Sequence, residues 1–157
     1  HDENARVLGG VVGHAGLFSN TRDMAIFSQT LINNGIYGWK RIFRAKTVAS
    51  FTSRANLIPE SSRCLGWDSP MGKASGGVYI SDASFGHNGF TGTSLWIDPE
   101  NEIIVILLTN AVHPNRKYKD PKYYDWRQRI HSAVYESLSI NEQNKKLLKR
   151  DKWIKSN

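Results

Sequence analysis

Two strand-forming segments joined by a short turn, residues 85–98 and 102–110, constrain the fold of this chain more than any other feature. The turn between them is Asp98-Pro99-Glu100-Asn101, and these residue types interrupt strands and favour tight turns. The two segments therefore predict an antiparallel pair of strands. The run from Ile103 to Leu108 has no polar alternation, so we expect it to be the central strand, buried on both faces.

The first of these segments contains a glycine-rich run, His87-Asn88-Gly89-Phe90-Thr91-Gly92-Thr93. Glycines on the edge of a sheet let another backbone lie close, and a substrate can be that backbone. Gly89 suits such a place because any side chain there would push away a substrate laid along the strand. Strand alternation directs the Asn88 side chain away from the face that His87 occupies. On residue type alone, His87 is an ordinary strand histidine.

Helix signals lie on both sides of the strands. Residues 20–35 begin with a capping asparagine, carry apolar residues at helical spacing and stop at a glycine, so they predict a helix. Residues 46–52 predict a shorter helix, and residues 64–68 and 77–81 predict short strands. Asp120 and Pro121 favour the start of a C-terminal helix. We expect its apolar stripe to lie across the sheet, and that stripe comprises Trp126, Ile130, Ala133, Val134 and Leu138.

These elements predict an α/β (α+β) fold, in which helices flank an antiparallel sheet on both sides. The 157 residues suffice for one domain with a modest core, and 39% apolar residues indicate a globular protein. We divide the domain into a glycine-rich segment with helices (1–60), antiparallel strands (61–112) and C-terminal helices with a basic tail (113–157). Ser139-x-x-Glu142 is expected to open the final, basic helix.

The net charge of +7 comes entirely from the C-terminal part, because residues 1–112 are neutral. Residues 113–157 carry twelve basic and five acidic side chains. The simplest interpretation is a solvated helical face, although such a tail also suits an acidic polymer or anionic headgroups. No nucleic-acid-binding motif accompanies the charge, so no nucleic-acid partner is expected. No membrane span is expected in this segment either, since the longest apolar run has only the length of a strand.

Several kinds of catalytic site are excluded by their missing patterns. The five histidines form no His-Glu-x-x-His motif and no close pair with the single cysteine, Cys64, so we expect no metal. A Gly-x-Ser-x-Gly elbow is absent, which argues against an α/β-hydrolase. Asp98 and Glu102 flank a turn, and we expect both to be solvated rather than to form an acid/base pair.

Two motifs resemble one family of serine hydrolases. The run His87-Asn88-Gly89, with Phe90-Thr91-Gly92-Thr93 after it, resembles the third motif of penicillin-binding proteins and class C β-lactamases, which is usually Lys-Thr-Gly and is His-Thr-Gly in an esterase-like branch. The segment His14-Ala15-Gly16-Leu17-Phe18-Ser19, followed by Asp23-Met24-Ala25, is similar to that family's Ala-Gly-Gly-Leu-x-Ser-Thr-x-x-Asp-Leu-Ala signature. The resemblance runs from residue 1 to about residue 138 and implies a β-lactamase/transpeptidase-like fold.

The Ser-x-x-Lys and Tyr-x-Asn motifs of that family are absent from this chain. We therefore expect it to be the C-terminal portion of a longer enzyme, with an incomplete fold and no activity by itself. The missing N-terminal segment of the same protein is an expected partner, and in one alternative it supplies the serine and lysine in trans. In another alternative, the chain is a non-catalytic module that binds cell-wall polymer or a partner through the remnant of the cleft and the basic tail.

The resemblance also implies a chemistry. Members of the family form an acyl-enzyme on serine, use no metal or organic cofactor, and act on β-lactams, peptidoglycan peptides or simple esters. The implied catalytic residues are His87, Gly89 and Phe90, with the Phe90 backbone N–H as one of two donors to the oxyanion. The implied substrate-binding residues are Asn88, Thr91 and His14. A small-molecule or peptide substrate and a periplasmic or cell-envelope location follow from the same resemblance.

Overall fold

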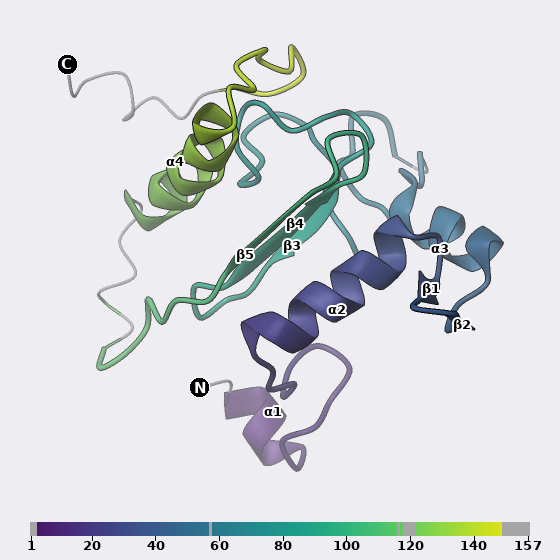
Figure 1. The fold of residues 1–157 in the computed structure, drawn as a ribbon. Coiled ribbons are helices and arrows are strands. Elements are labelled where there is room, and N and C mark those ends of the chain that lie inside the picture. The colour runs from purple at the N-terminus through teal and green to yellow at the C-terminus, as the bar shows by residue number, and fades with distance from the viewer. Residues whose placement is uncertain (1–2, 57, 116, 118–121, 149–157) are drawn as a thin grey trace.

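The structure is a computed structural model that describes residues 3–56, 58–115, 117 and 122–148. Its elements follow one another along the chain as shown in Figure 1. The helices are α1 (Glu3–Val7), α2 (Thr21–Ile32), α3 (Ala45–Thr52) and α4 (Lys122–Ser137). The strands are β1 (Ile36–Tyr37), β2 (Lys40–Arg41), β3 (Phe85–Asn88), β4 (Ser94–Asp98) and β5 (Ile103–Leu107).

The main sheet has the antiparallel order β3-β4-β5, and the predicted pairing across the turn after Asp98 is confirmed as that of β4 with β5. The expectation of one continuous strand over residues 85–98 is wrong, because this segment forms two strands, β3 and β4, that turn back on each other. The register pairs Gly86 with Trp96 and Trp96 with Val105. Among the described residues the central strand is β4, and every residue of β4 is buried. The expectation that Ile103–Leu108 is central is wrong, because β5 lies at the edge and is mostly half-buried. An unbroken apolar run indicates that both faces of a strand are covered. It does not indicate whether the strand has a neighbouring strand on one side or on both.

Helices cover both faces of this sheet, with α2 and α4 on opposite sides (Figure 1). One core lies toward α2 and α3 and comprises Leu31, Val48, Phe85, Leu95 and Ile97. The other core lies toward α4 and comprises Ile80, Trp96, Val105, Tyr135 and Leu147. Successive residues of β4 thus point to alternate cores, as a strand covered on both faces requires. The predicted α/β fold with a flanked antiparallel sheet is confirmed.

The start and the end of α2 follow from local chemistry. The Asn20 side chain accepts a hydrogen bond from the Asp23 backbone N–H at 3.0 Å and donates to the Asp23 carboxylate at 2.9 Å. The helix ends before Gly35, whose φ of +91° is in the region that favours glycine. A Cβ at Gly35 would lie 2.2 Å from the Phe43 carbonyl oxygen, so the chain needs glycine here on two grounds.

The predicted orientation of α4 is wrong. Trp126, Ile130 and Leu138 are 57%, 37% and 55% exposed, so most of the apolar stripe faces away from the sheet. Val134 alone of the stripe packs against the core on this side, half-buried. The fully buried side chains in the described part of α4 are polar or aromatic, and each is at most 1% exposed: Arg127, Gln128, His131, Ser132 and Tyr135. Apolar periodicity marks one face of a helix, but the sheet offers polar partners here, and only polar side chains can satisfy them.

Three other predicted elements are absent from the described part of the chain. Residues 64–68 and 77–81 form no strands, although isolated bridges join Cys64 to Arg54 and Asp68 to Gly86. Residues 139–148 form turns and irregular structure in place of the expected basic helix. Within the ranges that the structure describes, no helix combines the length and the apolarity that a membrane crossing requires.

Candidate functional site

The glycine-rich run forms a tight turn between β3 and β4, and we call residues 89–92 the glycine turn. The Gly92 N–H donates to the Gly89 carbonyl at 3.2 Å, and the Gly89 N–H donates to the Thr93 carbonyl at 2.8 Å. Gly92 has a φ of +127°, which favours glycine. A Cβ on Gly89 would lie 2.0 Å from the Thr93 Oγ1. A side chain at position 89 would therefore force the Thr93 side chain to move, before any substrate is considered.

Two other segments hold the glycine turn in place. After β5, the Ala111 N–H donates to the Thr91 carbonyl at 2.6 Å, and the Thr109 hydroxyl donates to the Gly92 carbonyl at 2.8 Å. From α4, the Arg127 guanidinium donates to the Gly89 carbonyl at 3.1 Å. Because three of its four carbonyl groups are bound in this way, the turn is a rigid feature of the fold.

A cavity of about 460 Å³ lies beside the glycine turn. Gly89, Phe90 and Thr91 line one side, and the segment from His14 to Phe18 lines another. Gly16 is required there, because a Cβ at this residue would lie 1.7 Å from the Gly10 carbonyl oxygen. The fold thus brings together the two segments in which the family motifs were recognised. Four of the predicted site residues contribute to this one cavity: His14, Gly89, Phe90 and Thr91.

Asn88 does not line this cavity. Its side-chain oxygen accepts a hydrogen bond from the Ser75 hydroxyl at 2.5 Å, and that hydroxyl accepts one from the Trp96 indole N–H at 3.0 Å. These contacts lie on the α4 side of the sheet, the direction that strand alternation predicts. A role for Asn88 in binding substrate stays a prediction, and its observed contacts support the end of β3.

His87 is exposed and also lies outside the cavity, two residues before the glycine turn. Its Nε2 is 3.1 Å from the Arg63 Nη1, and its Nδ1 is 2.9 Å from the Asn88 carbonyl oxygen. A guanidinium group can only donate, so Nε2 must accept, and the ring proton is on Nδ1. The arrangement therefore places the imidazole Nε2 beside the permanent positive charge of Arg63.

Arg63 is a site residue that sequence reasoning missed. Its guanidinium forms an ion pair with Asp68 at 3.1 Å, and the Asp68 backbone forms two hydrogen bonds with Gly86 of β3 at 2.7 and 2.9 Å. These contacts place the Arg63 side chain next to His87, which is 24 residues away in the sequence. No local pattern marks the residue, because only the pairing of segment 63–68 with β3 brings the two side chains together.

Replacing Arg63 by alanine should change the tautomer of His87. With the guanidinium present, we expect the Nδ1–H form to dominate. Without it, Nε2 loses its donor and the Nε2–H form should become populated. Long-range ¹H–¹⁵N NMR of the histidine rings distinguishes the two forms, and the His14 signals should stay unchanged as an internal control. The same His87 tautomer population in both proteins would show that Arg63 does not fix the ring.

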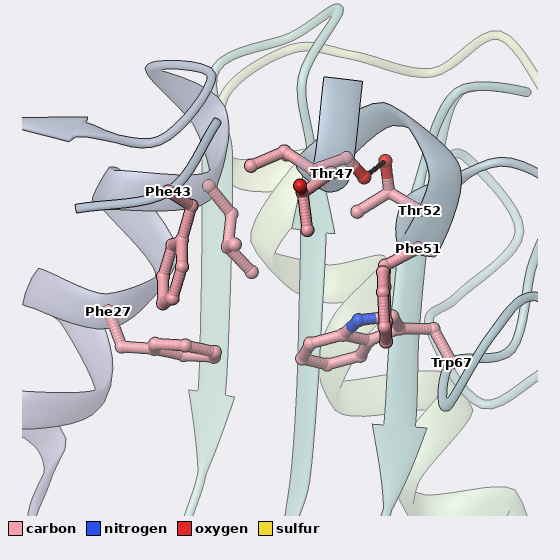
Figure 2. A pocket seen from close by; sticks show the side chains of 8 residues that line it. Phe27, Phe43, Thr47, Phe51, Thr52 and Trp67 are labelled. Carbon is pink, nitrogen blue, oxygen red and sulfur yellow. Dashed lines mark hydrogen bonds between the residues drawn. The ribbon is translucent and has the colours of Figure 1, made fainter. Parts of the chain in front are cut away.

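A second cavity, of about 210 Å³, lies between α2, α3 and Trp67 (Figure 2). The rings of Phe27 and Trp67 stack there with centroids 6.4 Å apart. Its hydroxyl groups are those of Thr47 and Thr52, and the Thr52 hydroxyl donates to the Val48 carbonyl at 3.0 Å. No charged group and no histidine lines it, so this cavity lacks the groups that acid–base or nucleophilic catalysis needs.

Asp98 corrects another expectation, because it is 1% exposed and not solvated. Its carboxylate accepts hydrogen bonds from the backbone and side chain of Ser81, from those of Asn101, and from the Tyr135 hydroxyl. Burial by itself raises the pKa of this carboxyl, but the hydrogen bonds from Ser81 and Asn101 outweigh burial, and the pKa is lowered. Glu102 is exposed, as expected. Asp98 is thus a structural anion.

Within the described ranges, no group of three or more His, Cys, Asp and Glu side chains is placed to hold a metal ion. Cys64 is buried, and its thiol contacts the Thr52 carbonyl at 3.4 Å. Burial raises the pKa of this thiol, which disfavours the nucleophilic thiolate.

Comparison with known proteins agrees with the fold. The Beta-lactamase family matches residues 1–129, so this chain belongs to the Beta-lactamase family of proteins. Similar curated proteins include one from Salmonella paratyphi B and one from Salmonella gallinarum, each named "Putative D-alanyl-D-alanine carboxypeptidase". They are 46% and 45% identical to this chain over 119 aligned residues, and the match covers 72% of this chain.

The chain spans about a quarter of those relatives, since the matched region covers 27% of their length. Among solved structures, a β-lactamase from Mycobacterium bovis has a similar fold, with a TM-score of 0.54 and 19% sequence identity. That match covers 76% of this chain and 44% of the other. This likeness concerns the fold alone.

Proposed function

We propose that this chain supplies the oxyanion donor and one wall of the active-site cleft in a serine hydrolase that cleaves peptides ending in D-alanyl-D-alanine. The observation that carries the proposal is the cavity of about 460 Å³, which joins the His14–Phe18 segment to the glycine turn. The printed names of the Salmonella relatives support the substrate class. β-Lactams and simple esters are the competing substrates for the same chemistry.

In this proposal, a serine hydroxyl from a segment outside this chain attacks the carbonyl carbon of the penultimate residue of the peptide. The serine proton passes to the departing amine, the terminal residue leaves, and water then hydrolyses the ester that has formed. The Phe90 N–H donates to the carbonyl oxygen as negative charge develops on it. We propose that a segment outside this chain supplies both the Ser-x-x-Lys motif, which contains this serine, and the Tyr-x-Asn motif, and we place the enzyme in the cell envelope.

The contact between Arg63 and His87 suggests how a substrate carboxylate is recognised. The positive charge beside β3 is that of the Arg63 guanidinium, which contacts the His87 Nε2 and already forms an ion pair with Asp68. A substrate carboxylate would share the guanidinium with Asp68 or displace it. A guanidinium stays charged at every physiological pH and binds carboxylates with charge-assisted hydrogen bonds. We therefore assign Arg63 to the free C-terminal carboxylate of the peptide, with His87 holding the guanidinium in place.

The decisive experiment measures release of D-alanine from a tripeptide ending in D-alanyl-D-alanine, with a chromogenic β-lactam and an ester assayed in parallel. The protein that carries this chain together with both missing motifs should release D-alanine, whereas the chain of residues 1–157 alone should not. Arg63→Ala should raise KM for the free-acid peptide about tenfold, the usual effect of losing one charge-assisted contact. The same variant should leave KM for the C-terminal amide of that peptide unchanged.

Arg22 is an exposed arginine that does not line the cavity, so it provides the matched control, and Arg22→Ala should change neither value. Serine-dependent turnover by residues 1–157 alone would contradict the proposal. So would a complete protein that binds the peptide without turning it over, which is the behaviour of a non-catalytic binding module.

A further inference from the structure

The buried arginine of α4 has no role in the function proposed so far. Arg127 is 1% exposed, and its guanidinium donates to the Gly89 carbonyl at 3.1 Å. Burying a guanidinium is costly, because the group cannot lose its charge and must be compensated by hydrogen bonds. Here the charge is directed at a carbonyl of the glycine turn.

The carbonyl that Arg127 binds belongs to the same peptide unit as the Phe90 N–H. In a planar trans peptide the C=O and N–H groups point in opposite directions. A contact that fixes the Gly89 carbonyl toward α4 therefore fixes the Phe90 N–H away from α4. Gly89 and Phe90 both line the cavity beside the turn. Two donors thus hold the Gly89 carbonyl: the Gly92 N–H within the turn, and the Arg127 guanidinium, which lies 38 positions along the chain from Gly89.

The positive charge also changes the strength of that donor. A hydrogen bond from a charged group polarises an amide, and a polarised amide is a stronger N–H donor. His131, one helical turn beyond Arg127, adds no second charge at neutral pH, because burial and the Arg127 charge lower its pKa to about 4. Its Nε2 lies 2.9 Å from the Ser94 hydroxyl, at the start of β4. The guanidinium is therefore the cation that faces the turn from this part of α4.

We propose that Arg127 is a positioning residue, which orients and polarises the Gly89–Phe90 peptide so that the Phe90 N–H donates to the negative oxygen of the transition state. This inference rests on the proposed function for its catalytic part. Its structural part, the coupling between the guanidinium and the peptide, holds independently of any activity.

The spectroscopic test uses residues 1–157 and three variants. In Arg127→Gln the Gly89 ¹³C′ and Phe90 ¹⁵N NMR signals should both move upfield, because the carbonyl loses a charged donor. Arg127→Lys keeps the charge and should restore part of both shifts. Arg129→Gln is the matched control, because Arg129 is exposed beside Trp126 on the outer face of α4, and it should change neither signal. Unchanged signals in Arg127→Gln would overturn the proposal.

The kinetic test uses the longer protein that carries both missing motifs, with the same three substitutions. We expect Arg127→Gln to lower kcat about 10- to 100-fold with KM nearly unchanged. The Phe90 N–H acts mainly on the negative oxygen of the transition state, so its displacement affects the bound substrate little. Arg127→Lys should recover part of kcat, and Arg129→Gln should keep all of it. An unchanged kcat in a folded Arg127→Gln protein would overturn the catalytic part.

The two tests separate this inference from the proposed function. If the longer protein hydrolyses none of the substrates, the proposed function fails, and the NMR signals still decide whether Arg127 controls the peptide. If Arg127→Gln does not fold, the wild-type protein decides the structural part through the scalar coupling across the hydrogen bond between Arg127 Nη and the Gly89 carbonyl carbon. A measurable coupling supports the contact, and its absence at a temperature where other such couplings are seen overturns it.

Discussion

Replacing Asp98 by alanine is expected to lower the free energy of unfolding by about 3–5 kcal/mol, enough to unfold a marginal domain. The carboxylate is 1% exposed and accepts hydrogen bonds from three segments: the loop at Ser81, the turn at Asn101 and the helix at Tyr135. Alanine would leave these donors buried without an acceptor, and each unsatisfied buried group is costly. Equilibrium denaturation by urea measures the change.

Two further variants isolate the cause. Glu100→Ala changes an exposed carboxylate in the same turn and should alter the free energy of unfolding by less than about 0.5 kcal/mol. Tyr135→Phe removes one of the donors together with its hydroxyl, so it should cost about 1–2 kcal/mol, clearly less than the alanine variant. If Asp98→Ala were as stable as wild type, Asp98 could not be the anion that joins β4 to α4.

Acidification from pH 6.5 to pH 4 should cost up to about 3 kcal/mol of stability through His131 alone. Burial first, and the Arg127 charge second, lower the pKa of this histidine from 6.5 to about 4 in the folded protein. Between these two values the unfolded chain binds a proton that the folded protein does not, so falling pH favours unfolding. The contribution of the neutral His131 to the free energy of unfolding is complete above pH 6.5 and is lost progressively down to about pH 4. The lowered pKa of Asp98 adds a separate loss at still lower pH, as its carboxylate is protonated.

Urea denaturation at a series of pH values tests this expectation. His131→Gln keeps a side chain that can bond to the Ser94 hydroxyl but cannot titrate, so its stability should depend much less on pH over this window. His14→Gln removes an exposed histidine and should keep the wild-type slope. An equally steep slope in His131→Gln would show that another group controls the acid sensitivity.

The elements that sequence reasoning predicted well are those whose signal is local. The cap at Asn20, the stop at Gly35 and the turn after Asp98 each depend on residues a few positions apart, and each appears where expected. The helix at α3 starts within one residue of its predicted position. The resemblance also selected two segments that come to line one cavity, although nothing local predicts that they meet.

The errors arise where an element meets a partner that is distant in the sequence. The apolar stripe of α4 predicted its buried face wrongly, because the sheet side offers a carbonyl, a hydroxyl and a carboxylate to Arg127, His131 and Tyr135. Polar side chains that satisfy such partners are invisible to apolar periodicity. The uninterrupted run in β5 was expected at the centre for a similar reason, since burial of the two faces does not specify the strand order.

The sequence by itself determined the family, the flanked antiparallel sheet and the glycines that the turn between β3 and β4 needs. These features depend on steric demands and capping contacts between residues that are close together in the sequence. Only the tertiary structure decided that Arg63 reaches His87 and that Arg127 reaches the Gly89 carbonyl. Each of these contacts joins segments more than twenty positions apart. Their geometry depends on how the packed layers align, which no local pattern encodes.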